Sequence, residues 1–416
     1  MHDAVAAPPG GNVSTGTPAL IVEIDFANDP TVTTRTWTDI TSDVRTISYT
    51  SSGRQHELQR TEAGTLTCTL SNRAGKYDPS NTASPYWPGV KRTRWIRVRS
   101  VWNSVVYSEW QGLIQGFSGE WPSAGMDATT TVVATDSFLA LNLFDLNGYS
   151  YPEQTTGQRV AAVAADTQVS TGNIDIGVST LPAITFTSSE SALSHLQAVE
   201  DNEAGIVFVA ADGTLAFHDR HHRAIFNATS VATIGDLVGE IPYSSSARFE
   251  LDDNNIWNRI VVTAAGEPNN VDSPVPQLAT DTASIASHYE RTLTKTLLSD
   301  SQNDALAAAQ FYVAAYAEPS ERIPGCEVIG RAAPAVWPYI LGAANSDRFL
   351  WVRRPSTEAS PRTISLPVFL ERKTTTITTG NDWRVNFQFT PADARLFWRL
   401  GVAGYSELAD TTVLGF

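Results

Sequence analysis

Three histidines close together are the most obvious candidates for chemistry in this chain. His218, His221 and His222 lie within five residues, in the segment FHDRHHR. Histidine is the commonest metal ligand, so a metal site is one interpretation. Neighbouring side chains on an extended segment point to opposite faces, however, and no second cluster of ligands is available to complete such a site. The sequence therefore predicts no metal ion and no cofactor.

Carboxylates occur in pairs, as general acid–base catalysis would require. Examples are Asp252–Asp253, Glu200–Asp201 and Asp25–Asp29. A glycosidase needs two carboxylates across a cleft, but pairs also arise by chance among 44 acidic residues. The sequence has no GxSxG, HExxH or Walker A motif, and no GxGxxG after a strand. We predict no catalytic residues and a protein that is not an enzyme.

The chain concentrates cations in one short stretch of an acidic sequence. Lys91, Arg92, Arg94, Arg97 and Arg99 place five cations in nine residues, whereas the net charge is −15. One interpretation is a solvated strand face. The other is a surface that pairs with an acidic partner, such as a neighbouring copy of the chain. The overall negative charge disfavours nucleic acid as a specific partner.

The composition is that of a folded protein rich in β-structure. The 416 residues suffice for roughly two to four domains. Charged residues make up 18%, and 11 Trp, 16 Phe and 12 Tyr supply core material. Cys68 and Cys326 are far apart, and Cys68 falls on the apolar side of a strand, which favours a buried free thiol over a disulfide. A reducing cytoplasm is consistent with this choice.

No targeting segment is expected. The first 18 residues have neither a basic region nor an apolar stretch typical of a signal peptide. No apolar run reaches the ~18 residues of a membrane span. Residues 1–17 are rich in Pro, Gly, Ser and Thr and predict a flexible N-terminal arm.

Period-two alternation predicts β-structure in the first third of the chain. Residues 20–26 alternate, and Leu66, Cys68 and Leu70 face away from the threonines between them. Further strands are expected at 96–99, 101–109, 111–119 and 128–135. These short strands with turn signals between them predict a first β-barrel domain over residues 18–150.

The rest of the chain divides into an α+β insertion, a second β region and a tail. Residues 151–245 hold a helix expected to begin at Ser189, followed by a hairpin around Asp212-Gly213. Residues 246–390 predict a second β-barrel-like domain with a helix from Ser301 and a strand over 383–389. Residues 391–416 form an aromatic-bearing C-terminal tail. The fold class is mainly β with an α+β insertion: two β-barrel-like domains plus a small helix–hairpin domain.

A long loop over residues 71–90 is built with unusual specificity. Tyr77, Tyr86 and Trp87 provide aromatic anchors, and three prolines stiffen the backbone. Loops longer than ~12–15 residues are usually functional or disordered, and this composition argues against disorder. We expect the loop to be a packing or interface device.

Several segments resemble, in their order, the tail hub proteins of long-tailed bacteriophages, also called baseplate hub or minor tail proteins. The resemblance covers about residues 18–390. The segments that carry it are Gly53-Arg54, Ala63 to Thr65, Leu70 to Asn72, Tyr77 to Pro79, Ser84 to Val90, Trp110 to Phe117, Ser189 to Asp219, Trp257 to Val262, Ser287 to Arg291 and Asp304 to Ile323.

The resemblance implies a structural role in a phage tail tip. It implies a homotrimeric ring in which two related β-barrels per subunit adapt the sixfold tail tube to the threefold tip. The implied partners are the tail tube or distal tail protein ring, and the tip, fibre and tape measure proteins. Genomic DNA would pass through the channel without specific binding, consistent with the acidic chain. The protein would be assembled in the host cytoplasm and belong to the virion tail tip.

The candidate interface joins the aromatic loop to the basic stretch. Its residues are Tyr77, Tyr86, Trp87, Lys91, Arg92, Arg94, Arg97 and Arg99. Many hub proteins carry a C-terminal wall-degrading or fibre-like extension, and this chain stops at Phe416. We therefore expect such work to lie on another polypeptide.

An alternative function is recognition of host cell-wall carbohydrate by a β-module of the tail tip. Aromatic side chains that stack on sugars would be needed. Candidates are Trp37, Trp87, Trp121 and Trp398.

Overall fold

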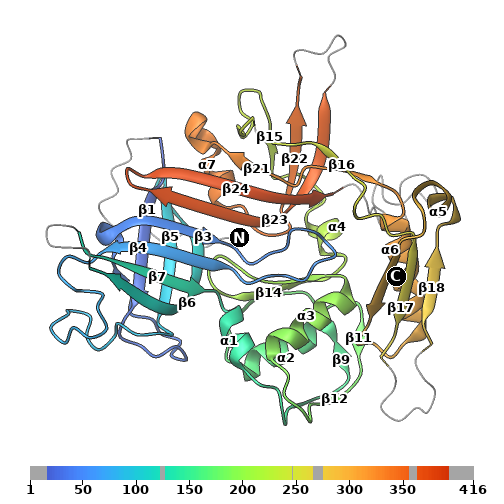
Figure 1. Ribbon diagram of the computed structural model, residues 1–416, viewed down its shortest axis with the longest axis horizontal. Coiled ribbons are helices and arrows are strands. Elements are labelled where there is room, and N and C mark those ends of the chain that lie inside the picture. Colours follow the sequence, from blue (N-terminus) through green and yellow to red (C-terminus); the bar gives the residue numbers. More distant parts are fainter. Residues whose placement is uncertain (1–15, 122–126, 246, 266–274, 356–362, 393–416) are drawn as a thin grey trace.

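The structure is a computed structural model that describes residues 16–121, 127–245, 247–265, 275–355 and 363–392. Most of the predicted arm over residues 1–17 and most of the C-terminal tail, including Trp398, lie outside these residues. The described chain is mainly β, as predicted. Figure 1 shows a large β body, a helical insertion below it and a smaller α+β unit at one side. No helix of the described residues is long and apolar enough to span a membrane.

The N-terminal half of the β body follows the predicted alternation. Leu66, Cys68 and Leu70 are buried, whereas Thr65 and Thr67 are exposed. Cys68 and Cys326 are both buried free thiols. The strands are β1 (Ala19–Asp25), β2 (Thr38–Asp39), β3 (Val44–Thr50), β4 (Thr65–Ser71), β5 (Trp95–Trp102), β6 (Val105–Glu120) and β7 (Thr129–Thr135).

The C-terminal half of the β body is formed by strands from the end of the chain. The predicted strand over 383–389 is confirmed, with Trp383, Val385, Phe387 and Phe389 buried. The elements are β15 (Ala232–Ile234), β21 (Gly325–Val328), α7 (Trp337–Leu341), β22 (Arg348–Arg353), β23 (Ile364–Thr378) and β24 (Asp382–Pro391).

Strand β23 joins the two halves into one sheet. It pairs with β24 along one edge. Along the other edge, it pairs with β22 over residues 364–369 and with β3 over residues 374–377. The 12-stranded sheet runs β15-β22-β23-β3-β4-β7-β6-β5-β1-β2; off this path, β24 pairs with β23, and β21 pairs with β24. In the described residues no sheet closes into a barrel, so the two predicted barrels are not confirmed.

Buried side chains from both halves of this sheet form one apolar core. It includes Ile47 and Leu66 from the N-terminal half, and Phe349, Trp351 and Phe387 from the C-terminal half. Each of these side chains is at most 1% exposed. Burial on this scale stabilises by roughly 25 cal/mol per Å² of apolar surface, so the two halves stabilise each other.

The insertion has its own core between helices and short strands. Helix α3 packs Leu196 and Val199 against Phe217 of the predicted hairpin. The helix begins at Ala192. Its N-cap is Ser191, two residues after Ser189, the predicted start. The elements are α1 (Phe138–Leu143), β8 (Ser150–Tyr151), β9 (Gln154–Thr155), α2 (Thr156–Asp166), β10 (Thr171–Ile174), β11 (Thr180–Leu181), β12 (Ile184–Thr185), α3 (Ala192–Glu203), β13 (Ile206–Val209), β14 (Leu215–His218) and α4 (His222–Phe226).

A third core is formed by helix α6 and a three-stranded sheet. Ser301 caps the helix through Asp304 N, as predicted, and Tyr312 and Tyr316 pack toward Ile260 and Val262. The elements are β16 (Glu250–Asp252), β17 (Arg259–Thr263), β18 (Gln277–Thr280), α5 (Thr282–His288), β19 (Thr292–Thr296), α6 (Gln302–Tyr316) and β20 (Ser320–Arg322).

Candidate functional site

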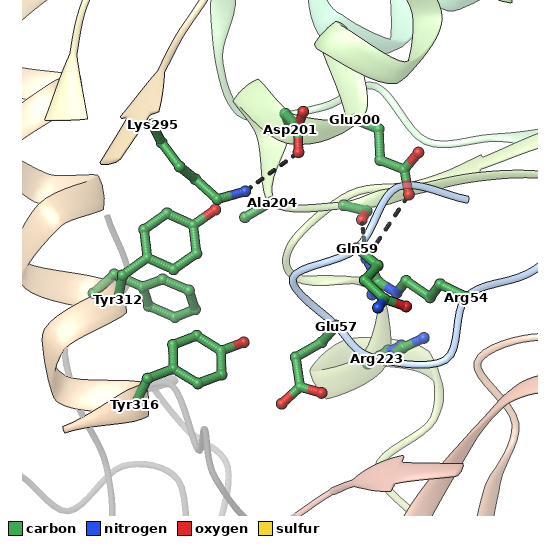
Figure 2. A pocket seen from close by; sticks show the side chains of 12 residues that line it. Arg54, Glu57, Gln59, Glu200, Asp201, Ala204, Arg223, Lys295, Tyr312 and Tyr316 are labelled. Carbon is green, nitrogen blue, oxygen red and sulfur yellow. Dashed lines mark hydrogen bonds and ion pairs between the residues drawn. The ribbon is translucent and has the colours of Figure 1, made fainter. Parts of the chain in front are cut away.

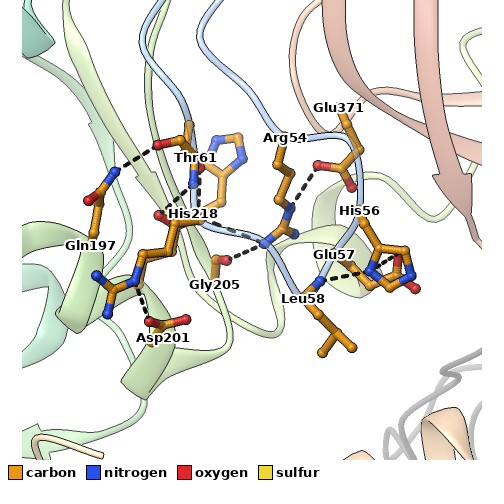
Figure 3. A network of polar contacts seen from close by, with 12 residues as sticks. Arg54, His56, Glu57, Leu58, Thr61, Gln197, Asp201, Gly205, His218 and Glu371 are labelled. Atoms are coloured by element: carbon orange, nitrogen blue, oxygen red, sulfur yellow. Dashed lines mark hydrogen bonds and ion pairs between the residues drawn. The ribbon is translucent and has the colours of Figure 1, made fainter. Parts of the chain in front are cut away.

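Residues 51–64, between β3 and β4, reach all three cores, and we call this segment the strap. The chain leaves the sheet after Thr50 and returns at Thr65. Gly53 and Glu62 close the segment with reciprocal backbone hydrogen bonds of 3.0 and 2.8 Å. Figure 3 shows the strap between α3 and the C-terminal strands, with its polar side chains spread in both directions.

The start of the strap fits tightly against the C-terminal half of the β body. A Cβ atom on Gly53 would lie 2.1 Å from the carbonyl oxygen of Glu371, so a side chain cannot be placed there without moving backbone. Asn345 Nδ2 donates to the carbonyl of Ser52 at 2.9 Å. The Ser52 hydroxyl donates to the carbonyl of Val209 and accepts from its N–H, which also ties the insertion to this point.

Arg54 provides the charged contact with β23. Its Nε donates to Glu371 Oε2 at 3.0 Å, and its Nη1 donates to the carbonyl of Gly205 at 3.2 Å. The other oxygen of Glu371 accepts from Arg223 Nη1 and from the Thr390 hydroxyl, both at 2.6 Å. Burial would raise the pKa of Glu371, but the two guanidinium groups outweigh burial and lower this pKa to about 2.

Helix α3 holds the end of the strap with polar side chains on one face. Gln197 Nε2 donates to the carbonyl of Thr61 at 2.9 Å, and the Thr61 hydroxyl donates to Glu200 at 2.6 Å. Asp201 accepts from Arg60 Nε at 2.7 Å. The spacing 197, 200, 201 places these groups together because helix residues three and four apart are neighbours.

The third core is attached to the strap by the Arg322–Glu57 ion pair and by an apolar contact. Arg322 of β20 makes two hydrogen bonds to the Glu57 carboxylate, at 3.0 and 2.8 Å. Leu58 packs against the third core. Lys295 of β19 donates to Asp201 at 3.2 Å, so α3 contacts this core as well. The strap thus fixes the insertion and the third core to the β body mainly through charged groups.

A small cavity of about 70 Å³ lies where these parts meet (Figure 2). The side chains of Tyr312 and Tyr316 enter it from α6, facing the strap. Cations and carboxylates are balanced around it, three of each, so the lining does not favour a ligand of either sign. The charged lining residues are Arg54, Arg223, Lys295, Glu57, Glu200 and Asp201.

Two of the three histidines stack at the edge of the junction. The rings of His218 and His222 lie 3.4 Å apart between centroids, and His222 Nδ1 is 2.8 Å from Asp175. Burial lowers the pKa of both, that of His218 to about 2, so both are neutral at pH 7. His218 Nδ1 contacts the hydroxyl of Ser346 at 3.2 Å. Within the described ranges, no group of three or more His, Cys, Asp and Glu side chains is placed to hold a metal ion.

The members of the carboxylate pairs have separate structural partners. Glu200 binds Thr61, and its neighbour Asp201 binds Arg60 and Lys295. Asp252 lies 2.7 Å from Arg322 Nε. Glu200, Asp201 and Asp252 are thus engaged in holding segments together.

The aromatic half of the predicted interface is partly used inside the chain. Tyr77 is fully buried and donates its hydroxyl to Asp43 at 2.7 Å. Tyr86 stacks on Phe26 with ring centroids 4.3 Å apart. Trp87 is 48% exposed. Trp87 is therefore the aromatic residue of this set that is available to another molecule.

The basic half is neutralised to a large extent by the chain's own carboxylates. Arg97 and Arg99 both bind Glu23, at 2.7 and 2.8 Å. Arg94 is buried and binds Asp29 at 3.3 Å, and Lys91 lies 3.8 Å from the same carboxylate. Arg92 is exposed. The interface hypothesis stays a prediction, now centred on Trp87 and Arg92.

No family model and no curated protein matches the chain. Among solved structures, the fold is similar to a prophage MuSo2 43 kDa tail protein from Shewanella oneidensis, at 11% identity and a TM-score of 0.53, covering 90% of this chain and 99% of that one. It is also similar to a tail protein from Neisseria meningitidis, at 11% identity and a TM-score of 0.55, covering 90% and 97%. The chain therefore has a fold found in phage tail proteins, along nearly its whole length.

Proposed function

We propose that the chain is a structural protein of a bacteriophage tail, acting as the hub of the tail tip. The observation that carries the proposal is the likeness to two tail proteins, which covers 90% of this chain and nearly all of each of theirs. The polar junction supports it, because its charged groups bind each other and connect three cores rather than surrounding a substrate-sized cleft.

We further propose a homotrimer that adapts the sixfold tail tube to the threefold tip. The pairing of β3 with β23 supports this arrangement, since it sets two β halves side by side in each subunit. Three subunits would then present six β halves around an axis. Trp87 and Arg92 would contact the next subunit or the adjacent distal tail ring.

In this proposal the ring surrounds the DNA channel and meets tip, fibre and tape measure proteins. The net charge of −15 supports a passage that does not retain DNA, because binding to phosphates requires clustered cations. The virion tail tip is the proposed location.

Native mass spectrometry and electron microscopy of assembled tails test the proposal. We expect a trimer of 45.0 kDa chains and three copies on the tail axis. A peripheral location together with glycan binding by the isolated protein would favour the carbohydrate-binding alternative. Trp87 and Trp121 are exposed and open to such stacking, whereas Trp37 lies under the Arg97 guanidinium.

Substitutions on the exposed face test the interface. The double variant Trp87→Ala/Arg92→Ala should remain a folded monomer and lose incorporation into tails. Trp121→Ala is the matched control, because this Trp is 64% exposed elsewhere on the β body. Normal incorporation of the double variant would show that the loop only covers its own subunit.

A further inference from the structure

A tight loop that follows strand β15 presents two neighbouring apolar side chains to solvent. Leu237 is 56% exposed and Val238 is fully exposed. The loop spans residues 235–240, which we call the knob. Its base is closed by Gly235 N, which donates to the carbonyl of Ile241 at 3.0 Å. Single exposed apolar residues are common, but two at the apex of one closed loop form a surface that another molecule can contact.

An ion-pair brace holds the knob in this conformation. Arg354 makes two hydrogen bonds to the Glu240 carboxylate, at 2.9 and 2.8 Å, and one to Asp236 at 2.6 Å. Glu240 also accepts the backbone N–H of Leu237 at 2.9 Å. A Cβ atom on Gly235 would lie 2.0 Å from Glu240 Oε2, so this glycine leaves room for the brace. Because its backbone is already held, the knob would lose little conformational freedom on binding.

An apolar groove of about 270 Å³ lies on another part of the same sheet. It is found where β24 ends, between β20 and the first residues of β23. Its polar lining residues are Ser320 and Glu321, and its apolar lining residues are Ile323, Leu366, Pro367, Val368 and Pro391. This lining favours an aliphatic side chain, because burying apolar surface is favourable and burying an unpaired charge is costly.

The knob and the groove lie on opposite sides of the paired strands β22 and β23. β15 pairs with β22, and β24 pairs with β23 along the edge opposite to β22. β15 and β24 are thus three strand spacings apart, about 14 Å. Ile234, just before the knob, is in register with Trp351, which is in register with Leu366 of the groove. Figure 1 shows β22 and the start of β23 projecting from the β body, with β15 beside β22.

We propose that the knob of one subunit inserts into the groove of the next subunit. A cyclic homotrimer needs two different surfaces that fit each other, because each subunit meets its neighbours head to tail. An apolar knob and an apolar groove, level with each other on opposite sides of one strand pair, meet this requirement. The inference rests on the proposed homotrimer and adds a second contact to the one proposed at Trp87 and Arg92.

Disulfide cross-linking in assembled tails tests this contact. Val238→Cys/Ser320→Cys places one thiol on the knob and one in the groove, whereas Cys68 and Cys326 are buried. Mild oxidation should give covalent dimers and trimers of this chain, because cysteines whose Cα atoms come within about 7 Å can be bridged. Val105→Cys/Ser320→Cys is the matched control and should give no such oligomers, since Val105 is 43% exposed but lies on β6.

The outcomes separate this inference from the proposed function. Three copies on the tail axis without cross-linked oligomers would overturn the knob contact and leave the hub proposal standing. Cross-linked trimers at the periphery of the tail would support the contact and contradict the hub location. A cross-link from Val238→Cys to a different tail protein would overturn pairing between copies of this chain.

A competition experiment tests the knob without new cysteines. Leu237→Ala/Val238→Ala keeps the brace and removes most of the apolar surface at the apex. When this variant and the wild-type chain are supplied in equal amounts, we expect tails to contain at least about tenfold less of the variant. Ile176→Ala/Val178→Ala in the insertion is the matched control, because these side chains are 74% and 46% exposed, and it should be incorporated normally. Equal incorporation of the knob variant and the wild type would overturn the proposal.

Discussion

The β body and the strap junction are both buried, but different forces hold them. Phe349 and Trp351, at 0% exposure, pack in an apolar core that needs no particular charge state. Glu371, also at 0% exposure, stays charged because Arg54 and Arg223 bind it. Apolar burial is non-directional, whereas paired charges require a defined geometry.

This difference assigns separate tasks to the two regions. The core accounts for the stability of the sheet, because apolar burial is the dominant favourable term in folding. Buried ion pairs add little net stability, since desolvation offsets their attraction, but breaking one is costly. The junction therefore fixes where the insertion and the third core sit, and it responds to charge and pH.

Truncating the core should have the largest effect on stability. Phe387→Ala removes a 1% exposed ring in contact with Phe349, and we expect a loss of about 4 kcal/mol in the free energy of unfolding. Urea titrations at low and high salt measure it, and the loss should be independent of salt. Val133→Ala, at a 39% exposed strand position, is the control and should cost far less. A salt-dependent loss for Phe387→Ala would contradict the conclusion that the core, unlike the junction, is held by apolar packing alone.

Removing the central cation of the junction should come next. Arg54→Ala leaves Arg223 as the only guanidinium bound to Glu371 among the contacts described, and it leaves Glu200 without its nearby cation. We therefore expect a loss of about 3–4 kcal/mol in the free energy of unfolding. Arg60→Ala is a matched control on the same strap, because Arg60 is half exposed in its pair with Asp201, and should cost at most about 1 kcal/mol. Denaturant unfolding compares them. Equal losses in unfolding free energy for Arg54→Ala and Arg60→Ala would mean that the buried pair contributes no more than the exposed one.

Local patterns in the sequence predicted the strands but not how they associate. Alternation over residues 65–71 and 382–391 is enough to identify two strands, because one face of each is buried. The pairing of β3 with β23 joins residues more than 320 positions apart and has no local signal. The sequence therefore could not show that strands of both halves share one sheet, and the two predicted barrels are not confirmed.

The junction was also missed by sequence reasoning. Arg54 and Glu371 are separated by 317 positions, and each alone looks like an ordinary surface residue. Gly53-Arg54 was noticed only as part of a family resemblance. Conversely, Arg94 looked available to a partner but is buried against Asp29, because alternation does not reveal which carboxylates lie opposite a strand.

Acid should weaken the junction through Glu371. Its pKa is lowered to about 2, so its contribution is present above the unfolded value near 4.5 and is lost as the pH falls toward 2. We expect about 3 kcal/mol of unfolding free energy to disappear over this interval. Urea titrations between pH 2 and 6 measure this loss. Glu371→Gln should remove this part of the acid sensitivity, and an identical pH profile in the variant would contradict the assignment.

The smallest expected effect concerns a single hydroxyl, and it distinguishes hydrogen bonding from packing at the junction. Thr61→Val keeps the shape of a fully buried side chain but removes the donor to Glu200. At pH 8.5, where Glu200 is mainly ionised, the loss should be about 2 kcal/mol, because a hydrogen bond to a charged group is lost. At pH 5.5 the loss should be smaller, since a neutral carboxyl accepts more weakly. Thr61→Ser, which keeps the hydroxyl, should show no such pH dependence. If Thr61→Val lowers the free energy of unfolding by the same amount at both pH values, packing rather than hydrogen bonding holds this contact. The junction would then be stabilised in the same way as the β body.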